Sequence, residues 1–375
     1  MNKVFLCKET EKGETRVALV PADIKKLAGL GYELMAQSGA GLKSGYTDDD
    51  YAAAGAKIAG GLGEGYGFAD IVVRVNKPDG IDGLRDGTLH VSSFDVFGEG
   101  AAIKEYAGAG IKLVSLEMVP RTTLAQKMDI QSSQASLAGY YAVILAAARL
   151  PKAFPMMMTP SGTISPAKIF IIGVGVAGLQ AIATAKRLGA RVEAFDTRPA
   201  VEEEVKSLGA RFVKIDLGET GQTEQGYAKE LTPEQIELQR KAQARVCAQS
   251  DIVITTAKVF GRRAPVLLTA DMVAQMRPGA VIIDMAVGTG GNVEGSDPEK
   301  DVLLDNGVTL VCGDRLERFV QKDASDMFSG NIFAFLEHFW DAEGKLLKID
   351  TGDEIMAGCL ITSDKKIVHE RFKGG

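Results

Sequence analysis

Short apolar runs rich in β-branched residues alternate with segments of helical periodicity along the first third of the chain. The apolar runs predict strands, and the proline that opens 21–30 predicts the first turn of a helix. Acidic residues after Thr47 predict another helix start, because carboxylates stabilise the unpaired amides of a first turn. The predicted strands are 3–7, 33–36, 70–75, 89–92 and 112–116, with a further helix at 101–107. This alternation predicts a parallel sheet covered on both faces.

A second series of strands and helices begins at Lys168 and continues to about Cys312. Before it lie a long helix, predicted over 132–150, and the turn-rich segment 156–166, which predicts a hairpin or arm. A helix near 327–340 is expected to carry the chain back to the first domain. The length of 375 residues suits two domains. The predicted division is 1–130 plus about 313–375 for the first domain and 131–312 for the second.

The segment Gly173-Val-Gly-Val-Ala-Gly178 carries the clearest chemical signal. It follows the buried-strand pattern 168–172 and precedes a predicted helix, 179–188, and a second strand, 191–195. In a dinucleotide-binding unit the first glycine permits a tight turn, the second admits the pyrophosphate, and the third lets helix and strand pack closely. The helix N-terminus offers unpaired amides to the phosphates. The predicted dinucleotide contacts are Gly173, Gly175, Val176, Ala177 and Gly178.

Asp196 ends the second strand of this unit, where a carboxylate accepts hydrogen bonds from the adenosine ribose hydroxyls. The carboxylate favours NAD(H), because it would repel the 2′-phosphate of NADP(H). Arg198 argues the other way, since arginine is the usual partner of a 2′-phosphate, but the carboxylate stands at the strand end itself. Asp196, Thr197 and Arg198 are therefore predicted on the ribose side.

Three further segments fit a nucleotide-binding domain. The strand 251–257 ends in Thr256 and Ala257, small residues against which an adenosine or ribose could lie; the alternative is a buried strand with a tight exit. The strand 280–284 runs into a glycine-rich end, where the nicotinamide is expected. The polar loop 218–231 holds Gly226 and Tyr227, and loops of this length are usually functional or disordered.

Composition narrows the class of protein. The net charge of −6 argues against a protein that binds nucleic acid or an anionic membrane. Four widely spaced cysteines, without a CxxC pair, indicate reduced intracellular thiols, so neither a zinc site nor any other metal is expected. The N-terminus becomes charged before an apolar signal segment can form, and no apolar run approaches the ~18 residues of a spanning helix. We expect a cytoplasmic protein.

The segment FPMMMTPSGTISPAKIFIIGVGVAGLQAIATAKRLGA, at 154–190, resembles the alanine dehydrogenase/transhydrogenase superfamily. Within it, the similarity is to the NAD(H)-binding component of proton-translocating transhydrogenase, and 120–129, 226–231 and 261–266 add to it. The resemblance implies an α/β fold of two Rossmann-like domains with parallel sheets and an interdomain cleft. It also implies a homodimer with an exchanged hairpin near 154–159.

In that family NADH passes its hydride to NADP⁺ on a separate subunit, and a membrane-spanning subunit couples the exchange to proton translocation. The resemblance thus implies both partner subunits and a place at the cytoplasmic face of the inner membrane. The family's nicotinamide-positioning arginine, glutamine and aspartate match Arg121, Gln126 and Asp129, with Ser132 just beyond. The family's mobile loop that closes over the nucleotide matches the loop with Gly226 and Tyr227, so the resemblance implies that these two residues contact the cofactor. The polar segment 120–134 is then predicted to aim a nicotinamide and not to transfer a proton.

Two alternatives remain open: an alanine dehydrogenase of the same superfamily, and a non-catalytic NAD(H)-binding module. Alanine dehydrogenase chemistry needs groups that bind a carboxylate and move a proton. Arg16 matches the expected arginine, but Arg74 or Asn76 stands where a lysine is expected, with Lys77 one place off. The remaining departures are Phe94 or Asp95 where a histidine belongs, and Gly288 in place of an acidic residue that the transhydrogenase pattern also has. His90, His338 and His369 are predicted to be structural or superficial.

Overall fold

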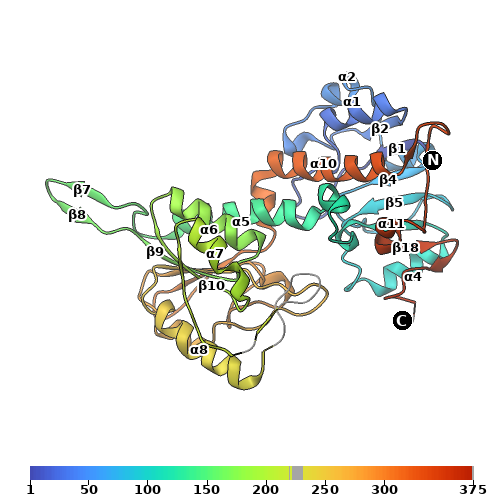
Figure 1. The fold of residues 1–375 in the computed structure, drawn as a ribbon. Coiled ribbons are helices and arrows are strands. Elements are labelled where there is room, and N and C mark those ends of the chain that lie inside the picture. The colour runs from blue at the N-terminus through green and yellow to red at the C-terminus, as the bar shows by residue number, and fades with distance from the viewer. Residues whose placement is uncertain (219, 222–230, 374–375) are drawn as a thin grey trace. The chain divides into compact units, whose positions relative to one another are not determined.

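The computed structural model describes residues 1–218, 220–221 and 231–373 (Figure 1). The chain divides into two compact units: unit 1 is Met1–Gln134 with Arg318–Gly375, and unit 2 is Ala135–Glu317. The predicted boundaries fall a few residues before these divisions. The first division lies inside α5 (Ile130–Arg149), which begins slightly before the predicted start at Ser132. The Asp129 carboxylate accepts the Ser132 backbone N–H at 2.9 Å, as a helix cap does, which accounts for the earlier start.

Unit 1 is built on an eight-stranded sheet with the order β19-β18-β6-β5-β4-β1-β2-β3. Strands β1 to β6 are parallel, and the strand order reverses between β1 and β4. The predicted strands are parallel, and β18 and β19 add an antiparallel edge that was not predicted. Asp364 and Lys365 form the two-residue turn between them with positive φ angles of 50° and 60°, the geometry that suits a tight hairpin. The strands are β1 (Lys3–Leu6), β2 (Glu33–Gln37), β3 (Lys57–Ala59), β4 (Ile71–Val73), β5 (Leu89–Ser92), β6 (Lys112–Ser115), β18 (Leu360–Ser363) and β19 (Lys366–Ile367).

Helices cover both faces of the unit 1 sheet. Val4 and Leu6 of β1 pack into the cluster that includes residues of α1, α2, α10 and α11, whereas Phe5 packs on the opposite side with Tyr66 of α3. Buried side chains of α4 extend that second face beside β6. The helices are α1 (Pro21–Leu30), α2 (Asp48–Ala53), α3 (Leu62–Phe68), α4 (Gly100–Gly108), α10 (Gln321–His338) and α11 (Glu354–Cys359), and a small hairpin joins β16 (Trp340–Asp341) to β17 (Leu346–Leu347).

Unit 2 is built on a seven-stranded sheet with the order β11-β10-β9-β12-β13-β15-β14. Six strands are parallel in the doubly wound order, with the reversal between β9 and β12. The edge strand β14 is antiparallel, so this sheet too is mixed and mostly parallel. The strands are β9 (Lys168–Ile172), β10 (Arg191–Phe195), β11 (Arg211–Phe212), β12 (Ile252–Thr255), β13 (Val281–Asp284), β14 (Val302–Leu303) and β15 (Thr309–Cys312).

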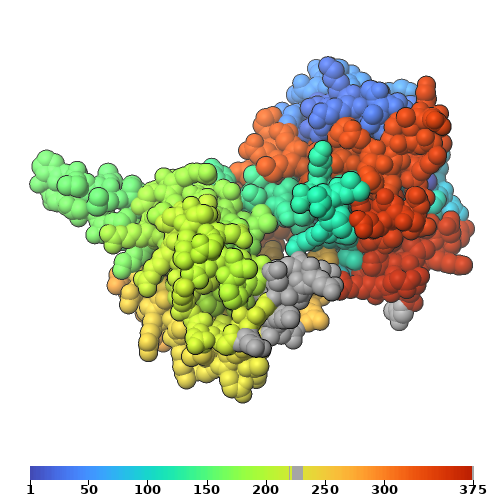
Figure 2. Space-filling model, viewed as in Figure 1, coloured from blue at the N-terminus to red at the C-terminus, as the bar shows by residue number. Residues whose placement is uncertain are grey.

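The unit 2 sheet is also buried on both faces (Figure 1). Ile169 and Ile171 of β9 pack with α5, α6 and α7, while Phe170 and Ile172 pack with α8 and α9. The helices are α6 (Val176–Arg187), α7 (Glu202–Ser207), α8 (Pro233–Cys247) and α9 (Ala270–Ala274). The predicted hairpin is present as β7 (Met157–Thr159) and β8 (Gly162–Ile164), and it extends away from the body of unit 2 (Figures 1 and 2).

Candidate functional site

The reversal of strand order in unit 2 carries the glycine motif. Gly173 leaves β9 with a φ of 95°, in the left-handed region that favours glycine. A Cβ at Gly173 would lie 2.6 Å from Oγ1 of Thr256, and that hydroxyl donates to the Gly173 carbonyl at 2.9 Å. A Cβ at Gly178 would lie 2.1 Å from the same carbonyl oxygen. Both glycines are therefore required by close packing between the turn, the first turn of α6 and the end of β12.

Gly175 differs from these two glycines, because nothing lies within 4 Å of a Cβ built on it. Its φ of −83° lies outside the left-handed region, so neither packing nor backbone conformation within the described residues requires glycine here. Gly175 is the N-cap of α6, and no described side chain caps the helix there. Val176, 44% exposed, and half-buried Ala177 follow it. The open space and the first-turn amides of α6 fit a phosphate group.

Asp196 and Arg198 form a tight pair after β10. The Asp196 carboxylate accepts the backbone N–H of Val174 at 2.7 Å and that of Arg198 at 2.9 Å. It also accepts Nε and Nη2 of Arg198 at 2.9 and 2.8 Å, and the hydrogen bond to Asp196 is the main cause that raises the pKa of Arg198. The intervening Thr197 accepts a hydrogen bond from Thr220 through its carbonyl. A ribose hydroxyl could bind Asp196 where Arg198 gives up one of these bonds.

Asn292 holds the exit of β12, and sequence reasoning did not include it in the site. Its side-chain amide accepts from the Ala257 backbone N–H at 3.1 Å and donates to the Ala257 carbonyl at 2.9 Å and the Pro265 carbonyl at 2.8 Å. The backbone N–H of Asn292 donates to the buried carboxylate of Asp284 at 2.9 Å. Asn292 thus fixes Ala257, which was predicted to contact the cofactor. The signal in the sequence was an aspartate at a strand end followed by Gly-Gly-Asn.

Gly288 is the position at which sequence analysis found no acidic residue, and the structure brings the carboxylate of Asp314 against it. A Cβ at Gly288 would lie 2.6 Å from Cγ of Asp314. Lys258 and Arg315 flank that carboxylate, with nitrogen–oxygen distances of 3.6 and 3.7 Å. An acid is therefore present beside Gly288, although it comes from the segment after β15.

The predicted nicotinamide-positioning residues lie in unit 1, and the nucleotide motif lies in unit 2. Arg121 and Gln126 are exposed, and Arg121 donates to Gln131 at 3.0 Å. Asp129 accepts both the backbone N–H and the hydroxyl of Ser132, at 2.9 and 2.5 Å. Asp129 and Ser132 are thus brought together at the start of α5. Gly226 and Tyr227 fall outside the described residues.

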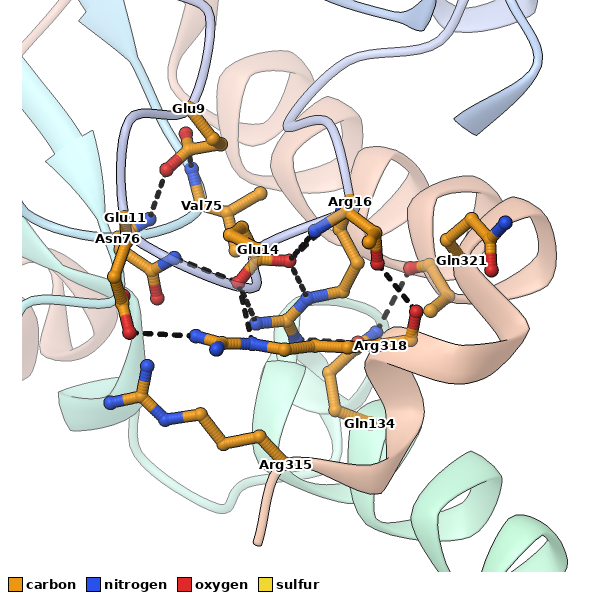
Figure 3. Close-up of polar contacts among 12 residues, drawn as sticks. Glu9, Glu11, Glu14, Arg16, Val75, Asn76, Gln134, Arg315, Arg318 and Gln321 are labelled. Atoms are coloured by element: carbon orange, nitrogen blue, oxygen red, sulfur yellow. Dashed lines mark hydrogen bonds and ion pairs between the residues drawn. The ribbon is translucent and has the colours of Figure 1, made fainter. Parts of the chain in front are cut away.

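The reversal of strand order in unit 1 is filled by buried charged groups (Figure 3). Glu14, fully buried, accepts Nε and Nη2 of Arg16 at 2.9 and 2.8 Å, and Arg318 approaches it at 3.1 Å. Asn76 donates to Glu14 at 2.8 Å, and Nη1 of Arg16 donates to Gln134 at 2.9 Å. Burial alone would raise the pKa of Glu14, but the hydrogen bonds and charge of Arg16, with Arg318 and Asn76, lower it to about 2.

Glu9 links the exits of β1 and β4 in the same unit. Its carboxylate accepts the backbone N–H groups of Val75 and Asn76 at 2.7 and 3.3 Å. Arg74 donates to the Lys8 carbonyl at 2.9 Å and lowers the pKa of Glu9, but burial is the larger effect and raises that pKa to about 7. Glu9 is therefore partly protonated near neutral pH, in a site closed by the chain itself.

The residues weighed for amino-acid dehydrogenation have internal partners. Arg16 is bound as described above, Lys77 pairs with Glu99 at 3.0 Å, and Asp95 occupies a turn with a φ of 57°. His90 is fully buried against the Tyr106 hydroxyl at 3.0 Å, and burial lowers its pKa to about 3. His338 binds Asp353 at 3.1 Å and His369 binds the Gly358 carbonyl at 3.1 Å, which fits structural roles for all three histidines.

Membrane-spanning helices and metal-binding clusters are both absent from the described residues. Among the helices of that part of the chain, none is both long enough and apolar enough to span a bilayer. Within residues 1–218, 220–221 and 231–373, no group of histidine, cysteine, aspartate and glutamate side chains could hold a metal ion.

Comparisons with known proteins agree over the whole chain. The family descriptions "Alanine dehydrogenase/PNT, N-terminal domain" and "Alanine dehydrogenase/PNT, C-terminal domain" match residues 5–138 and 142–370. The chain is 42% identical to an NAD(P) transhydrogenase subunit alpha protein of Rhodospirillum rubrum, covering 99% of each protein. It is 40% identical to the protein of the same name from Rickettsia prowazekii (strain Madrid E), covering 98% of this chain and 96% of that protein.

Solved structures agree with this assignment. The transhydrogenase from Sinorhizobium meliloti matches with a TM-score of 0.85 at 39% identity, over 98% of this chain and 99% of that one. An L-alanine dehydrogenase matches with a TM-score of 0.82 at 22% identity, over 99% and 98% of the two chains, and shows the shared fold. The predicted fold class and family resemblance are confirmed: the chain belongs to the alanine dehydrogenase/PNT family of oxidoreductases.

Proposed function

We propose that this chain is the NAD(H)-binding component of a transhydrogenase and that unit 2 holds the nucleotide. The observation that carries the proposal is Gly175, a glycine that the fold does not require, at the open N-terminus of α6. The amides of Val176, Ala177 and Gly178 would bind the pyrophosphate, because they begin a helix. Asp196 would accept hydrogen bonds from the adenosine ribose hydroxyls, with Thr197 and Arg198 beside it. Thr256 and Ala257, at the end of β12, would lie against the nucleotide.

Gly226 and Tyr227 would complete the nucleotide site, and Arg121, Gln126, Asp129 and Ser132 would orient the nicotinamide. When bound, NADH supplies a hydride to NADP⁺ held by a partner subunit. Hydride transfer needs the two carbons within about 3–3.5 Å, so the contribution of this chain is position, not proton transfer. A membrane-spanning subunit would couple the exchange to proton translocation, which puts this chain at the cytoplasmic face of the inner membrane.

The β7–β8 hairpin supports a homodimer. Met157, Met158 and Ile164 on it are 46%, 76% and 43% exposed, and apolar side chains in such numbers on one projecting hairpin favour a covering partner. A second copy that exchanges this hairpin would bury them.

The internal bonds of Arg16, Lys77 and His90 disfavour an alanine dehydrogenase. A substrate carboxylate would have to displace Glu14 from Arg16, and the neutral, buried ring of His90 has no path to a substrate. Robust turnover of pyruvate and ammonia by the chain alone would reverse this conclusion. NADH binding without exchange or turnover would instead favour a non-catalytic binding module.

The test mixes the pure chain with a recombinant NADP(H)-binding partner domain and follows hydride exchange from NADH to an NADP⁺ analogue. Gly175→Ala is the informative variant, since its methyl group enters open space in the protein and the space that a pyrophosphate would occupy. We expect unchanged thermal stability with at least about tenfold weaker NADH binding and slower exchange. Unchanged NADH binding in Gly175→Ala would remove the support for this site.

A further inference from the structure

Gly288 follows β13, and the space that a side chain at this position would occupy is taken by the carboxylate of Asp314, which follows β15. A Cβ on Gly288 would lie 2.6 Å from Cγ and Oδ2 of Asp314 and 2.7 Å from Oδ1. Gly288 is not among the residues with a positive φ, so its backbone does not require glycine. The absence of a side chain at Gly288 is therefore what admits the Asp314 carboxylate.

The backbone that carries Asp314 is fixed against the end of β13. The Gly313 N–H donates to the Asp284 carbonyl at 3.0 Å, and a Cβ on Gly313 would lie 2.6 Å from that oxygen. Gly313 comes directly after β15, so Asp314 stands at the carboxyl ends of two neighbouring parallel strands. Ligands of doubly wound sheets bind along this edge.

The Asp314 carboxylate has acceptor capacity to spare. Its partners among the described residues are Lys258 and Arg315, at 3.6 and 3.7 Å, both longer than a direct charge-assisted hydrogen bond of about 2.7–2.9 Å. The side chain is 26% exposed, and an ionised carboxylate can accept about four hydrogen bonds. Neither cation therefore occupies the Asp314 oxygens at the distance of a direct hydrogen bond.

We propose that Asp314 accepts hydrogen bonds from the nicotinamide half of the nucleotide, through the carboxamide or the ribose hydroxyls, and that Gly288 is the position cleared for it. This inference rests on the proposed function. Gly173 and Asp196 belong to β9 and β10, on one side of the reversal of strand order, whereas β13 and β15 lie on the other. A dinucleotide spans that reversal, so its second half lies on the side that carries Asp314.

Calorimetric titration of the full chain with ADP, ADP-ribose and NADH tests the assignment. Asp314→Ala, and the isosteric Asp314→Asn as a check on folding, should weaken NADH binding about tenfold and leave ADP binding unchanged. A loss seen with ADP-ribose as well assigns the contact to the ribose, and a loss confined to NADH assigns it to the carboxamide. Asp305→Asn, which removes an exposed carboxylate in the turn before β15, is the matched control and should change neither affinity.

Exchanging the residues at positions 288 and 314 gives the most decisive test. Gly288→Ala should reproduce the loss, because its methyl group displaces the carboxylate, and Gly288→Asp combined with Asp314→Gly should restore NADH binding to within about threefold. Equal weakening of ADP and NADH by Asp314→Ala and Asp314→Asn, or unchanged NADH binding in both, would overturn the inference. A wild-type chain that binds no NADH would instead overturn the proposed function.

Discussion

Glu14→Gln is the substitution whose effect on the free energy of unfolding follows most directly from the structure. The substitution keeps the shape of a fully buried side chain and removes its charge, leaving Arg16 and Arg318 without their shared carboxylate. Folding lowers the pKa of Glu14 from 4.5 to about 2. The difference of 4.5 − 2 pH units, at about 1.36 kcal/mol each, is about 3 kcal/mol of stability at pH 7. Loss of one partner from a buried ion pair costs about 3–5 kcal/mol in other proteins, which agrees.

The sign of the pH dependence follows from the lowered pKa. The folded state binds the Glu14 proton less tightly than the unfolded state, so the stabilisation is present above pH 4.5 and declines as the pH falls towards 2. About half of this stabilisation is lost between pH 4.5 and pH 3. The glutamine variant lacks this component, so the difference between the two proteins should shrink over that interval.

Urea unfolding followed by tryptophan fluorescence measures the difference in the free energy of unfolding of unit 1, the unit that contains Glu14. The single tryptophan, Trp340, lies in unit 1 and packs against Tyr32 with ring centroids 4.2 Å apart. Glu11→Gln is the control, because Glu11 binds Arg318 at 2.9 Å from a 37% exposed position and is worth at most about 1 kcal/mol. A Glu14→Gln effect below about 1 kcal/mol at pH 7, or a pH-independent one, would refute the reasoning.

Three further outcomes are expected. Gly178→Ala should destabilise the chain by about 1–3 kcal/mol in urea unfolding followed by circular dichroism, because its methyl group would lie 2.1 Å from the Gly173 carbonyl oxygen; a neutral effect would contradict that contact. Asn292→Ala should cost about 1–3 kcal/mol and weaken NADH binding in calorimetry, since it leaves the Ala257 N–H without its acceptor; intact binding would show that this strand exit positions nothing. Glu9→Gln should remove a loss of stability that the wild type suffers as the pH rises from 4.5 to about 7, because burial raises the pKa of Glu9, and identical pH profiles would disprove it.

The parts of the site that were predictable are contiguous in the sequence. The glycine motif and Asp196 lie within one strand–helix–strand unit, so periodicity and spacing identify them without knowledge of the fold. The antiparallel edge of unit 1 was missed because Lys365, after Asp364, adopts a positive φ angle at a turn position that sequence rules assign to glycine. Contacts between distant segments were equally out of reach: no local pattern pairs Gly288 with Asp314.

The two sheets share the same doubly wound strand order around β1 and β9, yet their strand-order reversals are used in opposite ways. In unit 2 the space beside Gly175 is open, and no described side chain caps the backbone amides that begin α6 there. In unit 1 the Glu9 carboxylate bridges the ends of β1 and β4, and the Glu14–Arg16 pair lies beside it. The chain itself thus supplies the charged groups that a bound ligand would otherwise supply. A buried network of ion pairs and hydrogen bonds of this kind holds shape and resists ligand entry, because a ligand must first break the bonds inside it. This contrast supports the proposal that unit 2 binds the nucleotide, while the buried polar residues of unit 1 serve chiefly to fix the backbone around its own reversal.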